Sequence, residues 1–142
     1  MFEVDQLRPF HLAFPVRDLA EARGFFEGTL GCRVGRSAER WIDFNFFGHQ
    51  ISAHLVDNEE PQGSNEVDGD QVPVRHFGIV LRMEEWVTLR AQLTSQGAHF
   101  IIPPKIRFKG LPGEQGTMFV RGPGECALEF KAFRDLSAMF AT

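Results

Sequence analysis

Four side chains in this sequence are candidates for a metal site: His11, His54, His76 and Glu129. His11 and His76 each open a short apolar segment, while His54 and Glu129 lie inside the later segments ISAHLV and CALEFK. Two imidazoles and one carboxylate are a common ligand set for a catalytic divalent ion. A single histidine at the start of a strand more often forms an ordinary hydrogen bond, so the prediction depends on how these residues recur.

They recur because the chain contains two similar halves. Residues 11–31 and 76–97 both begin with histidine, reach an arginine six residues later and end on a glycine. If the halves pack about a pseudo-twofold axis, His11 and His76 approach each other. His54 and Glu129 are expected to match in the same way. We predict His11, His76 and Glu129 as ligands, and His54 as either a fourth ligand or a polar residue lining the cleft.

Each half also predicts the elements that would position these residues. A short apolar strand comes first, and an amphipathic helix follows it, with Asp18 and Glu21 as a capping box in the first half. Three strand-like segments then follow each helix, at 32–37, 41–47 and 50–56 and at 100–102, 117–121 and 126–133. The sequence therefore predicts an α+β fold of two βαβββ modules.

Two polar stretches separate these elements. We assign the first module to residues 8–57, a linker to 58–73 and the second module to 74–134. The linker is rich in Gly, Asp, Glu and Asn, which favours a loop. A second long loop is predicted at Pro103–Gly116, where two prolines stand next to each other, and loops of that length are often functional.

Composition narrows the classes of function. The chain has 142 residues, 43% of them hydrophobic, and a net charge of −4, which fits a globular protein without a basic stripe for nucleic acid. The sequence contains no apolar run of about 18 residues, so we expect no contact with membranes. Cys32 and Cys126 show no metal or disulfide spacing, which favours reduced thiols and a cytoplasmic location.

Three segments carry a resemblance to a known family. The opening FHLAFPVRDLAEARGFFEGTLGC, the segment RHFGIVL and the closing RGPGECALEFKAF resemble the vicinal oxygen chelate superfamily, which includes glyoxalases, bleomycin resistance proteins and extradiol dioxygenases. The likeness spans about residues 8–133, so we treat 8–134 as one domain of this family. It implies an open, curved mixed sheet around a cleft, with metal ligands at His11, His54, His76 and Glu129.

The resemblance also implies a range of activities. Members with three ligands use the positions of His11, His76 and Glu129, whereas glyoxalase I-like members have a glutamate where this chain has His54. We expect a divalent-metal-dependent enzyme of lyase, isomerase or dioxygenase type, acting on a small substrate chelated through vicinal oxygens. The ion could be Fe, Mn, Ni, Zn or Co. The alternative is a metal-free protein that binds or sequesters a small molecule, as bleomycin resistance proteins do.

Aromatic and basic residues complete the predicted site. Five of them could contact a substrate, although the aromatic ones could equally be core residues: Trp41, Phe44, Phe46, Phe119 and Arg107. Small proteins of this family often dimerise, so we expect a homodimer.

Overall fold

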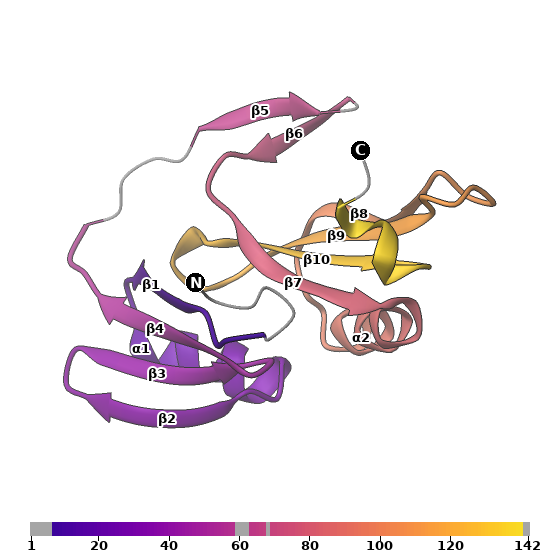
Figure 1. The fold of residues 1–142 in the computed structure, drawn as a ribbon. Coiled ribbons are helices and arrows are strands. Elements are labelled where there is room, and N and C mark those ends of the chain that lie inside the picture. Colours follow the sequence, from indigo (N-terminus) through magenta and orange to yellow (C-terminus); the bar gives the residue numbers. More distant parts are fainter. Residues whose placement is uncertain (1–6, 59–62, 68, 141–142) are drawn as a thin grey trace. The chain divides into compact units, whose positions relative to one another are not determined.

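The computed structural model describes residues 7–58, 63–67 and 69–140. The chain divides into two compact units, Met1–Glu59 and Glu60–Thr142, so the division falls inside the predicted linker. Figure 1 shows the elements of both units.

The first unit is a βαβββ module. Its elements are β1 (His11–Val16), α1 (Leu19–Arg23), a π-helical turn η1 (Gly24–Thr29), β2 (Arg33–Ala38), β3 (Trp41–Phe46) and β4 (His49–Leu55). The sheet has the order β1-β4-β3-β2, in which β1 and β4 are parallel and the other pairs are antiparallel.

The second unit repeats this arrangement. It contains β7 (Phe77–Arg82), α2 (Met83–Ser95), β8 (Phe100–Arg107), β9 (Gln115–Arg121), a short helix η2 (Pro123–Glu125), β10 (Ala127–Phe133) and a final helix η3 (Leu136–Phe140). Its sheet has the order β7-β10-β9-β8, again with only the β7–β10 pair parallel. The predicted fold of two similar βαβββ modules is confirmed.

The predicted helix limits follow from identifiable caps. The Asp18 carboxylate accepts hydrogen bonds from the backbone N–H groups of Ala20 and Glu21, at 2.8 and 3.2 Å. Gly31 and Gly97 end the helical segments with φ of +73° and +71°, a conformation that favours glycine. The first helix is not α-helical throughout, because from Gly24 onwards the turns widen and Leu30 N–H bonds the carbonyl of Phe25, five residues back.

Each unit buries one face of its sheet under its own helix. In the first unit, Phe26 is fully buried, and its ring lies 5.5 Å from Phe14 and 5.1 Å from Phe44. In the second unit, Trp86 is fully buried, and its indole N–H donates to the carbonyl of Phe130 at 2.9 Å. Because strand side chains alternate, the residues between these core positions lie on the opposite face of each sheet.

Two predicted loops contain strands instead. Within the predicted linker, the expectation of a loop is wrong at 64–73, where β5 (Ser64–Val67) and β6 (Asp70–Pro73) form an antiparallel hairpin. The Asp-Gly dipeptide at 68–69 is a strong hairpin signal, and Gly69 has the positive φ of +82° that such turns need. Residues 59–62 of the predicted linker lie outside the described part of the chain.

The predicted Pro103–Gly116 loop is shorter than expected, because β8 runs on through both prolines to Arg107. The register with β9 shifts between Phe100 and Ile102 and again between Ile102 and Lys105, the interval that contains both prolines, and β8 is the edge strand of its sheet. Proline lacks an N–H donor, so edge strands and bulges are the places where a sheet accepts it.

Candidate metal centre

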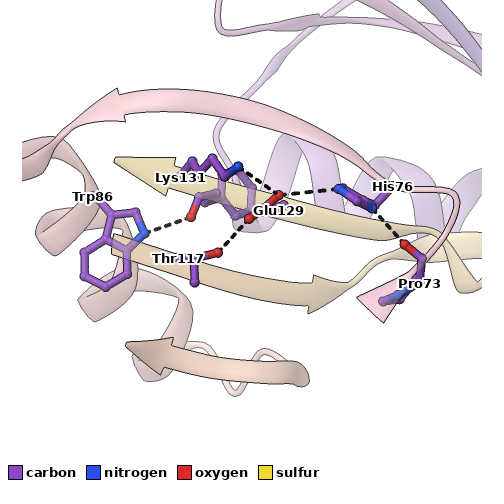
Figure 2. Close-up of polar contacts among 7 residues, drawn as sticks. Pro73, His76, Trp86, Thr117, Glu129 and Lys131 are labelled. Carbon is purple, nitrogen blue, oxygen red and sulfur yellow. Dashed lines mark hydrogen bonds and ion pairs between the residues drawn. The ribbon is translucent and has the colours of Figure 1, made fainter. Parts of the chain in front are cut away.

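His76 and Glu129 form a close pair in the second unit. His76 immediately precedes β7, and Glu129 lies on the neighbouring strand β10, opposite Gly78. The imidazole Nε2 lies 3.4 Å from the carboxylate oxygen Oε1 (Figure 2). The two residues are 53 positions apart in the sequence, so it is the parallel pairing of β7 with β10 that brings them together.

Gly78 permits the close approach of the two strands at this point. A Cβ atom at position 78 would lie 1.6 Å from the carbonyl oxygen of Glu129, which is too close for any side chain. The glycine is therefore part of the backbone geometry that places Glu129 beside His76.

The second polar atom of each side chain is also fixed. His76 Nδ1 lies 2.8 Å from the carbonyl oxygen of Pro73, and Thr117 Oγ1 donates to Glu129 Oε2 at 2.7 Å (Figure 2). A carbonyl oxygen can only accept, so in the neutral imidazole the proton lies on Nδ1 and the lone pair lies on Nε2. Nε2 and Oε1 face each other, and these contacts leave both atoms available to bind a metal ion.

Two further residues border the pair. The ring of Phe119 lies 5.1 Å from the His76 ring, edge to face, and only 3% of Phe119 is exposed. Lys131 Nζ lies 4.0 Å from Glu129 Oε1, and its side chain is 40% exposed, against 15% for Glu129. The carboxylate thus has an aromatic wall on one strand and a cation two residues further along its own strand.

The donor atoms fit a divalent ion. Metal–nitrogen and metal–oxygen bonds are each about 2.1 Å long, so two atoms 3.4 Å apart are close enough to bind the same ion. Among residues 7–58, 63–67 and 69–140, no group of three or more His, Cys, Asp and Glu side chains is arranged to hold a metal. His76 and Glu129 are therefore two of the three predicted ligands, and His11 belongs to the first unit.

The strand registers correct the predicted match of His54 with Glu129. In the first unit, His11 on β1 lies opposite Gln50 on β4. The position two residues after His11 lies opposite Ser52, and Pro15 lies opposite His54. In the second unit the position two residues after the histidine is Gly78, and its partner is Glu129. Ser52 is thus the counterpart of Glu129. His54 is four residues along the sheet from the level of His11, about 13 Å at the usual strand rise.

A carboxylate does occur beside Ser52, on the next strand. Asp43 lies opposite Ser52 and is only 8% exposed. Its Oδ1 accepts from Ser52 Oγ at 2.5 Å, and its Oδ2 accepts from Gln50 Nε2 at 3.3 Å. The sequence carries one signal for Asp43: in WIDFNF it alternates with apolar residues, which places it on the face opposite the core.

The predicted substrate-binding residues lie in different surroundings. Phe44 and Phe46 are 1% and 2% exposed and pack on Phe26, so of the two interpretations the core position applies. Trp41 is half-buried and lies opposite His54. Arg107 Nη2 lies 3.8 Å from Asp70 Oδ2 on the β5–β6 hairpin. Phe119 is the predicted aromatic residue that contacts a predicted ligand.

Comparison with known proteins agrees with this architecture. The model of the Glyoxalase/Bleomycin resistance protein/Dioxygenase superfamily matches residues 8–130. A crystal structure of a glyoxalase/bleomycin resistance protein/dioxygenase from Alicyclobacillus acidocaldarius is 35% identical, with a TM-score of 0.78 over 94% of this chain and 96% of that one. The chain therefore belongs to this superfamily, as its opening and closing segments indicated.

More distant structures share the fold. The fosfomycin resistance protein FosX from Listeria monocytogenes is 16% identical, with a TM-score of 0.69 over 95% of this chain and 98% of that one. FosX from Mesorhizobium loti is 15% identical, with a TM-score of 0.65 over 98% and 100%. No protein with a curated description matches the chain significantly. None of the helices in the described part of the chain is long and apolar enough to cross a membrane.

Proposed function

We propose that this protein is a divalent-metal-dependent enzyme acting on a small substrate that binds through two neighbouring oxygens. The observation that carries the proposal is the His76–Glu129 pair, in which Nδ1 and Oε2 are anchored and Nε2 and Oε1 face each other at 3.4 Å. Ligands whose other polar atoms are fixed in this way are typical of protein metal sites.

The proposed ligand set is His11, His76 and Glu129, with His11 brought to the pair within one chain or between two. Fe, Mn, Ni, Zn and Co all accept such imidazole and carboxylate donors. When bound, the ion would act as a Lewis acid on the substrate oxygens, in lyase, isomerase or dioxygenase chemistry. The chain's own contribution is to orient the donors, since Pro73 sets the histidine tautomer and Thr117 fixes the carboxylate.

The second candidate is a metal-free protein that binds a small molecule. It is favoured by the His76–Glu129 contact itself, because a protonated imidazole and a carboxylate at 3.4 Å can stabilise each other without an ion. In that case the two residues would offer hydrogen bonds to a ligand beside Phe119.

Metal content separates the two candidates. We expect protein purified without an affinity tag to hold a divalent ion at about one equivalent, measured by inductively coupled plasma mass spectrometry. The variants His11→Ala, His76→Ala and Glu129→Gln should lose the ion while keeping a cooperative melting transition. His99→Ala is the matched control, because His99 is exposed and distant in sequence from the site.

The variant His54→Ala should retain the ion if the register argument is correct. A folded wild-type protein that binds no divalent ion, even after dialysis against Co²⁺ and Zn²⁺, would contradict the enzyme proposal and favour the metal-free candidate.

We also propose a homodimer in the cytoplasm. Phe10 before β1 and Val87 on α2 are 62% and 52% exposed, and a dimer could cover such apolar surface. Sedimentation at micromolar concentration tests the homodimer, since a purely monomeric protein contradicts it.

The two cysteines support the cytoplasmic location. Cys32 and Cys126 are buried thiols that are not joined in a disulfide, as expected in a reducing compartment.

A further inference from the structure

Lys131 occupies a distinctive place beside the candidate metal centre. Its partner across the sheet is Thr117, whose own partner on the other side is Lys105, so the three residues form one row across β10, β9 and β8. Partners in register share a face of the sheet, and Thr117 shows which face this is, because its hydroxyl donates to Glu129. Lys131 therefore lies on the face that carries the candidate site (Figure 2).

The other cations on this side already have a carboxylate. Asp70, on the β5–β6 hairpin, forms ion pairs with Lys105 and with Arg107, the latter at 3.8 Å. Lys105 and Arg107 are thus held by the hairpin. Together with Lys131 and Glu129, these residues comprise three cationic side chains and two carboxylates, an excess of positive charge even before a divalent ion is added.

Lys131 is differently placed. Within the described residues, the Lys131 ammonium group has Glu129 Oε1 as its carboxylate neighbour, at 4.0 Å. That distance is too long for a hydrogen bond. Oε1 is also the oxygen that faces His76 Nε2. A divalent ion between Nε2 and Oε1 would repel the ammonium group, because like charges at this range disfavour each other. The side chain is 40% exposed, so it has room to turn toward another acceptor.

We propose that Lys131 is the anion-binding residue of this site, and that the ligand is a small molecule with an anionic oxygen group such as a carboxylate, phosphonate or phosphate. This inference rests on the proposed metal-dependent function. In the ligand complex the ammonium group of Lys131 pairs with the anionic oxygens, while His76 and Glu129 hold the ion next to them. A lysine ammonium is a compact point charge suited to this role.

The test uses Co²⁺ and two matched probes, glycolate and glycolamide. Both present a hydroxyl and a carbonyl oxygen, but only glycolate carries a negative charge. Their affinities for the Co²⁺-loaded protein are followed by visible absorption of the ion in the wild type and in Lys131→Met, Lys131→Arg and Lys109→Met. Lys109 is the control, because it is an exposed lysine between β8 and β9 in the same unit.

We expect Lys131→Met to weaken glycolate binding about tenfold or more and to change glycolamide binding less than twofold. Lys131→Arg should keep most of the preference for glycolate, and Lys109→Met should behave as the wild type. Co²⁺ binding itself should be equal or tighter in Lys131→Met, since a repelling charge is removed.

Two results overturn the inference in different ways. If Lys131→Met binds Co²⁺ and both probes as the wild type does, or loses both probes equally, then Lys131 only balances the charge of Glu129. If the wild-type protein binds no Co²⁺, the proposed function fails and this inference falls with it. Melting curves of the variants show whether a loss of binding comes from unfolding.

Discussion

Glu129 shows how a residue's chemistry is set by its neighbours rather than by its type. One carboxylate oxygen accepts a hydrogen bond from the buried Thr117, and the other lies between His76 and Lys131. The two oxygens therefore have different roles, although the group is symmetric by itself. Oε1 would be the oxygen that holds an ion beside His76, because Oε2 already accepts from Thr117.

Thr117 provides a test of this division at the residue scale. We expect Thr117→Val, which keeps the shape and removes the hydroxyl, to weaken Co²⁺ binding about ten- to a hundredfold, as loss of a ligand's supporting hydrogen bond commonly does. Thr117→Ser should bind Co²⁺ nearly as the wild type does. Isothermal titration with Co²⁺ measures both variants, and equal affinities for Thr117→Val and the wild type would show that the hydroxyl does not position Glu129.

Cys32 gives a second prediction, on reactivity. Burial raises the pKa of the Cys32 thiol from 9.0 to about 11. At about pH 8 the thiolate fraction falls from about 10% to about 0.1%, and the thiolate is the reactive form. We expect iodoacetamide to modify Cys32 about a hundredfold more slowly in the native protein than in urea.

The variant Cys126→Ser isolates the Cys32 signal in that experiment, with mass spectrometry as the readout. The same shift has a consequence for stability. Because the folded state holds the proton more tightly, its stability should decrease as the pH rises from about 9 to about 11. Rapid native labelling at about pH 8 would contradict the buried, protonated state of the thiol.

The sequence predicts candidate residues, but it does not show how they align across a sheet. The repeat of histidine, arginine and glycine is what predicts His11 and His76, and their role as ligands stays a prediction. It misaligned His54 with Glu129, because the register of two parallel strands depends on pairing between distant segments. Ser52, the actual counterpart, carries no signal of its own, and Thr117 becomes notable only once β9 is known to pair with β10.

At the scale of elements, local patterns predicted strands and helices well where periodicity was strong. In the second half, Trp86, Leu89 and Leu93 recur at helical spacing, and all three are buried in α2. The patterns failed where proline and polar residues normally indicate a loop, in β8 and in the β5–β6 hairpin. In both cases a neighbouring strand supplies hydrogen bonds that composition does not reveal.

The β7–β10 pair depends on one glycine, which leads to a prediction for this element. Gly78→Ala should lower the free energy of unfolding by about 1–3 kcal/mol or more, because the new Cβ would collide with the Glu129 backbone. Gly24→Ala is the matched control, since nothing lies within 4 Å of its Cβ position and its φ is −58°. That variant should be stabilised by about 0.4–1 kcal/mol.

Urea denaturation measures both changes. The pair of variants separates a general effect of replacing glycine from the specific collision at β10. A Gly78→Ala protein as stable as the wild type would mean that β7 and β10 do not approach as closely as described.

On the scale of the whole molecule, each unit has a core of its own, so the fold does not require a metal. We expect the protein in EDTA to unfold in one cooperative transition. Co²⁺ at about a hundred times its Kd should add about 2.7 kcal/mol, which corresponds to a rise in Tm of roughly 5–10 °C for a chain of this size. Calorimetry with and without Co²⁺ measures the shift.

The opposite result is informative as well. A protein that shows no melting transition in EDTA would assign the ion a structural role, contrary to the open site proposed here. The overall fold was predictable because two similar halves repeat one pattern of strand, helix and three strands.

The adjacent prolines in β8 have a consequence for how chains of this protein meet. Neighbouring residues of a strand direct their N–H groups to opposite sides, so Pro103 and Pro104 remove one donor toward β9 and one toward the outside. The register shift at β9 absorbs the first loss. The second leaves the outer edge of β8 a poor template for a strand from another chain, which protects it from the edge-to-edge growth that leads to fibrils.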